Sequence, residues 1–209
     1  MNNKIAFGLV VVGVLVALVF LRPHPHTSSV VASPRSVSRS ATSVVTHSVV
    51  RPLSVSSTAH GVVWPPTVTA AFIERVLARA GSPAVGMGQT LYQLGVRYGI
   101  DPAFALAFFH HESGYGLHGV ARSTLSLGNI RCTAGWRCDP TGGYRAYRSY
   151  TEGFEDWYRL LTQVYVANGL NTVEKIIPVY APNADNNDEA NYIASVNADI
   201  AAYRRGEVV

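Results

Sequence analysis

Apolar and polar residues divide the chain into three parts. Residues 5–21 form an uncharged and almost wholly apolar run, residues 22–66 show no sustained helical or strand period, and residues 67–209 show repeated helical stripes. As a helix, the first run would measure roughly 25 Å, which is at the short end for crossing a bilayer. We therefore expect a transmembrane helix over 1–21, a disordered linker over 22–66 and a helical domain over 67–209.

Helix start and stop signals recur through the last part. Apolar residues at helical spacing predict helices over about 68–80 and 88–98, each followed by a glycine that can end it. Asp101 and Pro102 then supply an N-cap and a proline at the first helical position. The residues 104–109 that follow are apolar on every side of a helix. A helix without a polar face must be buried, so we place this one at the centre of the domain.

Three more helices are expected later in the chain. Ser149 and Asn171 each begin a capping pattern, and Asp188 can cap the last helix. A helical stripe of apolar and aromatic residues follows the first and the last of these signals. Pro178 should kink or end the helix that begins after Asn171, near Tyr180.

The segment 113–148 is rich in glycine and carries no helical stripe. Long irregular segments within compact domains are usually functional. We expect loops there, with at most a small hairpin. The predicted fold class is therefore mainly α: a helical domain with a loop-rich or small β segment, preceded by a transmembrane helix and a disordered linker.

Charge is distributed unevenly along the chain. The whole sequence has 17 Lys and Arg against 13 Asp and Glu, and 48% of its residues are hydrophobic, which excludes a wholly disordered protein. Residues 1–66 hold 5 of the basic residues and no acid, so residues 67–209 hold 12 basic against 13 acidic residues, a net charge of −1. Because binding to nucleic acid normally needs a basic domain, we expect no nucleic-acid partner.

The N-terminal apolar run has features of an uncleaved signal-anchor and of a secretory signal. Lys4 precedes it, as is usual for both. The run is longer than the apolar region of most cleaved signals, and the nearest small-residue site ends at Ala32, eleven residues beyond it. We therefore expect a single-pass membrane protein whose domain lies outside the cytoplasm, or a secreted protein if the segment is cleaved.

Glu112 is the first acidic residue after the long apolar run, and Ser113 and Gly114 break the helix directly behind it. Desolvation at such a place disfavours the ionised carboxylate and raises its pKa. A carboxylic acid that stays protonated near neutral pH can donate a proton to a glycosidic oxygen. The alternative is a helix-ending glutamate that points into water or pairs with Arg122.

Several motifs share their order and spacing with one family of enzymes. They span about 90–205 and are the segments 108–116, 119–124, 128–130, 144–149, 152–157 and 179–182, followed by Tyr192. Together they resemble the bacterial endo-β-N-acetylglucosaminidases of glycoside hydrolase family 73. The resemblance implies a lysozyme-like helical fold and hydrolysis of the β-1,4 bond after N-acetylglucosamine in peptidoglycan glycan strands, with Glu112 as the general acid. We expect no cofactor and no obligate protein partner.

Two other functions remain open from the sequence. A lytic transglycosylase or muramidase also uses a glutamate followed by serine on a buried helix, although the segment 127–130 differs from the downstream motif expected of transglycosylases. A non-catalytic glycan-binding module could keep the same fold. The new ends produced in a digested glycan would distinguish these functions.

A second catalytic group is harder to assign. Tyr180 matches the tyrosine of the family's Tyr-Ala-Thr-Asp motif, which implies a role in shaping the subsite of the reacting sugar. Asp185 stands two residues later than the aspartate of that motif, so the role of that aspartate does not transfer directly. Asp185 and Asp139 are the candidates for a base or nucleophile. An N-acetyl sugar can use its own acetamido oxygen instead.

Aromatic and amide side chains in the glycine-rich segment are candidates for binding sugar. Tyr115, Trp136 and Tyr147 could stack on pyranose rings, and Asn129 could hydrogen-bond an acetamido group. The alternative for the aromatic residues is packing in the core of the domain. The alternative for Asn129 is a role as a turn residue.

Cys132 and Cys138 are the only two cysteines, and they lie close together in a segment expected outside the cytoplasm. We expect them to form a disulfide. A metal site would need further ligands at suitable spacing. His110 and His111 are adjacent and therefore point in different directions from a helix, unlike the two histidines of a His-Glu-x-x-His motif. We expect no metal site.

Overall fold

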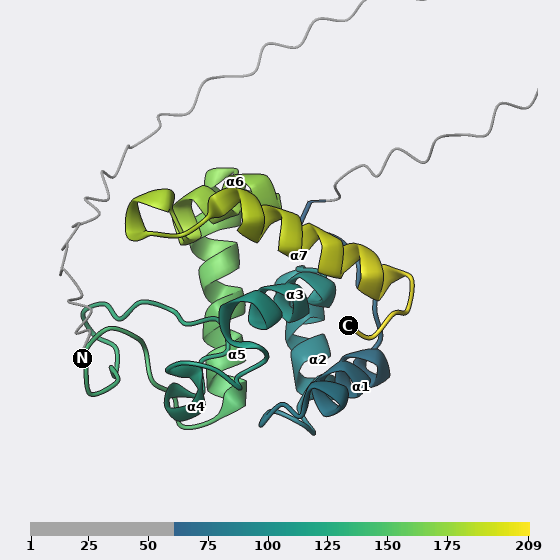
Figure 1. Ribbon diagram of the computed structural model, residues 1–209, viewed down its shortest axis with the longest axis horizontal. Helices are drawn as coiled ribbons and strands as arrows, with labels where there is room; N and C mark the ends of the chain where they lie inside the picture. The colour runs from purple at the N-terminus through teal and green to yellow at the C-terminus, as the bar shows by residue number, and fades with distance from the viewer. Residues whose placement is uncertain (1–60) are drawn as a thin grey trace, which may run out of the picture. The chain divides into compact units, whose positions relative to one another are not determined.

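The computed structural model describes residues 61–209 (Figure 1), so the predicted transmembrane helix over 1–21 and most of the predicted linker over 22–66 lie outside the described residues. The described part is helical and contains no strand, which confirms a mainly α fold. None of its helices is long and apolar enough to cross a membrane. Its α-helices are α1 (Ala70–Ala80), α2 (Gly88–Tyr98), α3 (Pro102–Ser113), α4 (Ala121–Thr124), α5 (Tyr150–Leu160), α6 (Val173–Tyr180) and α7 (Glu189–Arg204).

Most helix boundaries follow the signals in the sequence. The side chain of Thr69 caps α1 by accepting a hydrogen bond from a backbone N–H of the first turn. Helices α1 and α2 end at Gly81 and Gly99, both with φ of +67°, a left-handed conformation that glycine adopts without strain. Helix α6 contains Pro178 and ends at Tyr180, as predicted.

Helix α3 is the central helix of the described part. Its residues from Pro102 to Phe109 are all buried, as the apolar sequence predicts. It packs against α2 and α7, and α7 passes across it in Figure 1. The rings of Phe108 and Phe109 also lie 5.4 and 5.1 Å from the ring of Trp157 in α5. Contacts with three helices therefore fix the position of the C-terminal end of α3.

The folded part begins earlier than the sequence predicts. Val62 is fully buried. Its N–H donates to the carbonyl of Asn171 at 2.8 Å, and its carbonyl accepts from the N–H of Asp101 at 3.0 Å. The expected boundary between a linker over 22–66 and a domain over 67–209 is therefore corrected, because Val62 belongs to the core. The next residues, Val63 and Trp64, are apolar but exposed, so the pattern of this stretch does not mark Val62 as buried.

A buried cluster around Asp101 joins three segments of the domain. The carboxylate of Asp101 accepts a hydrogen bond from the Thr67 hydroxyl at 2.6 Å and from the Ala103 N–H at 3.1 Å. The guanidinium of Arg204 forms an ion pair with the same carboxylate at 3.1 Å. Because Thr67 precedes α1 and Arg204 ends α7, this cluster holds both segments against the N-terminal end of α3.

The glycine-rich segment contains loops, the short helix α4 and two isolated β-bridges. These bridges pair Arg131 with Tyr144 and Cys138 with Arg145. The arrangement agrees with the loop-rich or small β segment that the sequence predicts. Helix α4 is not predicted, because four residues are too few to show a helical period.

Cys132 and Cys138 form a disulfide within this segment, with their Cα atoms 5.7 Å apart. Its reduction is expected to lower the free energy of unfolding by about 2 kcal/mol, because the bond restricts the unfolded chain over a short loop. Urea unfolding with and without a thiol reductant measures this difference. A double variant, C132S/C138S, should not respond to the reductant. Equal stability of the oxidised and reduced wild-type protein would contradict the prediction.

A buried ion pair connects the loop segment to α5. The Asp156 side chain is 3% exposed and lies 2.8 Å from the guanidinium of Arg145. The hydroxyl of Tyr147 donates to the same carboxylate at 2.7 Å, and Arg159 reaches its other oxygen at 3.2 Å. Two residues of the loop segment, Arg145 and Tyr147, are therefore held by one side chain of α5.

Candidate active site

The candidate site lies where α3 ends. Glu112 occupies the last turn of α3, and Gly114 ends the helix with φ of +56°. The Ser113 hydroxyl donates to the carbonyl of Leu127 at 2.8 Å and accepts from the N–H of Gly116 at 2.8 Å. Ser113 thus fixes the turn that follows the helix and brings residues 127–129 beside Glu112.

The Glu112 carboxyl group has two hydrogen-bond donors. The Tyr192 hydroxyl, from α7, donates to Glu112 Oε1 at 2.5 Å. The side-chain amide of Asn129 donates to the Glu112 backbone carbonyl at 2.8 Å and lies 3.4 Å from Glu112 Oε2. Asn129 has φ of +47°, in a region that asparagine tolerates better than most residues. The side-chain amide of Asn129 is therefore a direct hydrogen-bond donor to Glu112, the proposed acid.

Close packing between the loop and α5 places Asn129 in this position. Gly128 has no room for a side chain, because a Cβ there would collide with the indole of Trp157. The carbonyl of Gly128 accepts a hydrogen bond from the Tyr180 hydroxyl, at the end of α6. Gly128 is thus held between α5 and α6, and the next residue, Asn129, faces Glu112.

Burial raises the pKa of Glu112 from its ordinary 4.5 to about 7. The hydrogen bonds from Tyr192 and Asn129 and the positive charge of Arg131 all favour the carboxylate, but they only partly offset the effect of burial. Glu112 is therefore protonated in a large fraction of molecules at neutral pH. This is the state that a general acid requires.

Three tyrosines, Tyr165, Tyr180 and Tyr192, lie near Glu112, the proposed acid. Burial raises the pKa of Tyr192 and Tyr180 well above the ordinary value and that of Tyr165 to about 12, and the negative charge of Glu112 adds to each shift. The rings of Tyr165 and Tyr180 lie 5.9 Å apart, and Tyr180 lies 5.7 Å from Phe108 of α3. These tyrosines are therefore neutral at physiological pH and form a largely apolar wall near Glu112.

The two histidines before Glu112 contact α7 in different ways. The ring of His111 stacks on Tyr192 with centroids 3.7 Å apart. His110 Nδ1 lies 2.6 Å from Asp199 Oδ2, and this hydrogen bond raises the pKa of His110. Burial lowers the pKa of His111. The histidines therefore help to hold α7 against the end of α3.

Tyr115 does not occupy the position predicted for a sugar-binding residue. It is only 2% exposed, and its hydroxyl is hydrogen-bonded to that of Tyr203, 2.6 Å away. Its ring stacks on His110 with centroids 4.7 Å apart. Tyr115 has φ of +59°, which turns its side chain into the core after the helix ends. The structure therefore corrects the prediction that Tyr115 stacks on sugar.

The other two aromatic candidates lie in or beside the disulfide loop. Tyr147 is 7% exposed and bonds Asp156, so its ring packs within the protein and the prediction of sugar contact is corrected for this residue as well. Trp136 is 38% exposed, and the Arg145 guanidinium lies 4.1 Å from its ring centroid. One face of the indole is therefore already covered by a cation.

The two candidates for a second carboxylate differ in their surroundings. Asp139 accepts a hydrogen bond from the Thr141 hydroxyl at 2.6 Å and from the Tyr144 N–H at 2.8 Å, and these bonds hold its pKa below the ordinary value. It therefore stabilises its own turn. Asp185 is exposed, in a short 3₁₀ turn (Asn183–Asp185). Within residues 61–209, neither forms a hydrogen bond or ion pair with Glu112.

Sequence reasoning did not assign Tyr192, Tyr165 or Arg131 to the site. Tyr192 belongs to the apolar stripe of α7, where an aromatic residue has the same pattern whether or not its hydroxyl reaches a partner. Arg131 follows Asn129 by two residues and lies in the loop segment. Asn129 and Glu112 are both candidates from the sequence, but the sequence does not predict that they pair.

Comparisons with known proteins do not identify a family. A scan against models of protein families finds none that matches this chain, and a search of curated proteins finds no relative. In residues 61–209, no three His, Cys, Asp or Glu side chains come together in an arrangement that could hold a metal ion.

Proposed function

We propose that this protein is a glycoside hydrolase that cleaves the β-1,4 bond after N-acetylglucosamine in peptidoglycan glycan strands. Glu112 is the general acid that protonates the glycosidic oxygen. The single observation that carries this proposal is the Glu112 carboxyl group, which ends a buried helix and has a pKa of about 7. The sequence motifs around Glu112 supply the substrate class.

The environment of Glu112 suits a proton donor better than a nucleophile or a base. A nucleophile or base must be ionised, which burial in an apolar wall disfavours. A proton donor must be neutral before the reaction, which the same burial favours. Tyr192 and Asn129 donate to the carboxylate that forms after the proton leaves, and so they stabilise the product of proton transfer.

Displacement at the sugar carbon is proposed to use the acetamido group of the substrate: its oxygen bonds that carbon as the protonated glycosidic oxygen leaves, and water then opens the resulting oxazolinium ring. Two enzymic carboxylates about 5–5.5 Å apart would raise each other's pKa, as expected of a nucleophile and acid pair. The groups that act on the Glu112 pKa within the described residues are Tyr192, Asn129 and Arg131, and none is an acid. An acetamido oxygen that attacks the sugar carbon needs no enzymic nucleophile. Asp185 remains the candidate for a more distant base.

The fold and location of the protein are part of the proposal. A mainly α domain with a central apolar helix ending in the catalytic glutamate is proposed to be lysozyme-like. The segment 1–21 is proposed to anchor the protein in the cell membrane, with the domain on the outer side, where its substrate lies. Tyr180 holds Gly128 and borders the subsite of the reacting sugar.

Product analysis tests the proposal directly. The full-length chain is incubated with purified peptidoglycan, and the new ends are identified by mass spectrometry. Reducing N-acetylglucosamine ends are expected. Reducing N-acetylmuramic acid would indicate a muramidase, anhydro-muramic ends a lytic transglycosylase, and binding without any new ends a non-catalytic glycan-binding module.

Substitution of Tyr192 by Phe is expected to shift the pH dependence of cleavage. The Tyr192 hydrogen bond lowers the pKa of Glu112, so its loss raises that pKa further. A hydrogen bond to a charged group contributes about 1.5–3 kcal/mol, so the alkaline limb of kcat/KM should move up by about one to two pH units. Activity at a single pH would not reveal this shift, and a full pH profile is required.

Tyr203→Phe is the matched control for this prediction. It removes the same hydroxyl from the same helix, at a place where the hydroxyl contacts Tyr115 and not Glu112. Its pH profile is expected to match that of the wild-type protein. An unchanged alkaline limb in Tyr192→Phe would show that Tyr192 does not tune the acid.

A further inference from the structure

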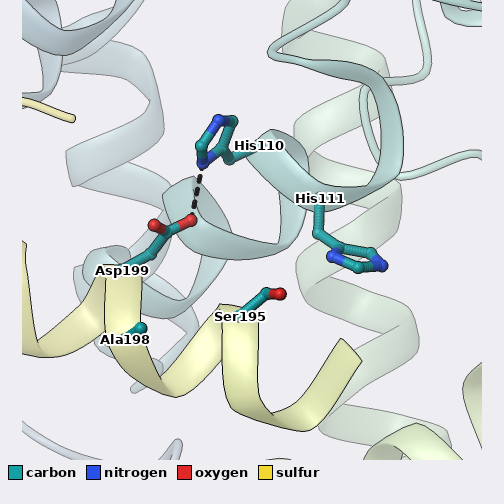
Figure 2. Close-up of a pocket in the computed structure, with 5 residues that line it drawn as sticks. All are labelled: His110, His111, Ser195, Ala198 and Asp199. Carbon is teal, nitrogen blue, oxygen red and sulfur yellow. Dashed lines mark hydrogen bonds and ion pairs between the residues drawn. The ribbon is translucent and has the colours of Figure 1, made fainter. Parts of the chain in front are cut away.

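A hollow of about 390 Å³ lies between α3 and α7, beside the candidate active site. His110 and His111 line it from α3, and Ser195, Ala198 and Asp199 line it from one face of α7 (Figure 2). Its volume is within the range of small-molecule sites. Glu112 does not line it.

His111 separates this hollow from the proposed acid. It directly precedes Glu112, and its ring stacks on Tyr192, the residue that donates to the Glu112 carboxyl group. In Figure 2, His111 and Ser195 lie at one side of the hollow, and the bonded pair of His110 and Asp199 lies at the other. A substrate bound at Glu112 would therefore need to extend only past His111 to enter the hollow.

The hollow offers hydrogen-bond donors that the protein does not use. Within residues 61–209, the Ser195 hydroxyl and both ring nitrogens of His111 form no hydrogen bond. His110 uses Nδ1 to contact Asp199, which leaves Nε2 available, and its side chain is 41% exposed. The hydrogen bond to Asp199 raises the pKa of His110, and in the protonated ring Nε2 carries a proton that it can donate. The Ser195 hydroxyl, Nε2 of His110 and the one N–H of a neutral His111 ring are therefore open to acceptor atoms of a ligand.

This set of donors favours a ligand rich in oxygen acceptors. The carboxylate of Asp199 is only 16% exposed and is balanced by His110, so it offers little attraction to a cation. Carbonyl and carboxylate oxygens would satisfy the open donors, and the hydrogen bond from a protonated imidazole would be charge-assisted. An N-acetyl sugar presents hydroxyl groups and a single acetamido carbonyl, whereas a peptide presents a carbonyl oxygen at every residue and a carboxylate at its end.

We propose that the hollow binds the peptide substituent of the sugar next to the cleaved bond, through its carbonyl and carboxylate oxygens. This inference rests on the proposed function, because in peptidoglycan every second sugar of the strand carries a peptide. A strand with N-acetylglucosamine at Glu112 has a peptide-bearing neighbour on either side. The hollow makes the protein selective for strands that still carry their peptides.

Kinetics on two substrates test the selectivity. The full-length chain is given glycan strands with intact peptides and strands from which the peptides have been removed enzymatically. Ser195→Trp fills the hollow and is expected to lower kcat/KM on intact strands about tenfold, the effect of losing one or two hydrogen bonds, with less than about twofold change on stripped strands. The milder Ser195→Ala should lower it in the same direction with no added bulk.

Ala201→Trp is the matched control, since Ala201 is an exposed residue of α7 that does not line the hollow. It should leave cleavage of both substrates at the wild-type rate. An equal loss on both substrates in Ser195→Trp, or no loss on either, would overturn the peptide subsite while leaving the hydrolase intact.

A binding measurement separates this inference from the proposed function. The imidazole NMR signals of His110 and His111 in the full-length chain, held in detergent micelles, are followed during titration with a disaccharide that carries a peptide. They are expected to shift with this compound and to stay in place with a peptide-free N-acetylglucosamine oligomer. If the wild-type protein cleaves neither glycan, the proposed function fails, and these signals still decide whether the hollow binds peptide. Signals that do not move refute the subsite.

Discussion

Replacing Glu112 by Gln is expected to lower the rate of glycan cleavage about 10³-fold, within the range that general acid catalysis contributes. The amide has nearly the same shape as the carboxylic acid but has no proton of suitable acidity to give to the leaving oxygen. The rate is measured by the release of reducing ends from purified peptidoglycan. Binding of the glycan should survive, because the wall of tyrosines remains.

Two controls accompany this substitution. Glu207→Gln makes the same change at an exposed glutamate that pairs with Arg205, and it should keep the wild-type rate. Circular dichroism should show that the Glu112→Gln protein is folded. Full activity in a folded Glu112→Gln protein would rule out Glu112 as the acid.

The same variant should change the dependence of stability on pH. The pKa of Glu112 is about 7 in the folded protein and 4.5 ordinarily, so the folded state binds more protons than the unfolded state between these values. Wild-type stability therefore falls as pH rises from about 4.5 to 7, by up to about 3 kcal/mol. Glu112→Gln should lack this component, which unfolding curves at several pH values can measure.

Asp156→Ala is expected to lower the free energy of unfolding by about 3–5 kcal/mol, because it leaves Arg145 as a buried charge without its partner. The Arg145 side chain is only 11% exposed, and the Tyr147 hydroxyl would lose its acceptor as well. Urea unfolding measures the change. The loop segment, which these two residues attach to α5, should also become more accessible to proteases.

Glu155→Ala provides the contrast, since the residue is the direct neighbour of Asp156 in the same helix. Its ion pair with Arg97 joins side chains that are 39% and 65% exposed. Pairs of this kind contribute about 1 kcal/mol or less. If Asp156→Ala were as mild as Glu155→Ala, the buried network would not stabilise the domain as described.

The helices were predictable from the sequence because their signals are local. Gly81, Gly99 and Pro178 act on the backbone within one turn, and the apolar run of α3 requires burial wherever it lies in the fold. The same reasoning identified Glu112, since the change from apolar run to glycine turn occurs within a few residues. The burial of Val62 cannot be predicted in this way, because it depends on Asn171, which is distant in the chain.

The partners of Glu112 could not be predicted in the same way. Asn129 and Tyr192 are 17 and 80 residues away in the chain, and only the packing of the loop and of α7 against α3 brings them together. The sequence alone does not separate sugar binding from core packing for Tyr115 and Tyr147, because an aromatic residue in a glycine-rich segment has the same local pattern whether its ring points inward or outward. The left-handed backbone conformation of Tyr115, just after α3 ends, turns its ring into the core.

The Asp101 cluster has a mechanical consequence. Tension applied to the chain ahead of Gly61 would pass through Val62 and Thr67 into Asp101, and from there to Arg204. Asp101 and Glu112 stand at opposite ends of α3, about 16 Å apart at the rise of an α-helix. A pull on the N-terminal side would therefore load first the end of α3 that is remote from Glu112.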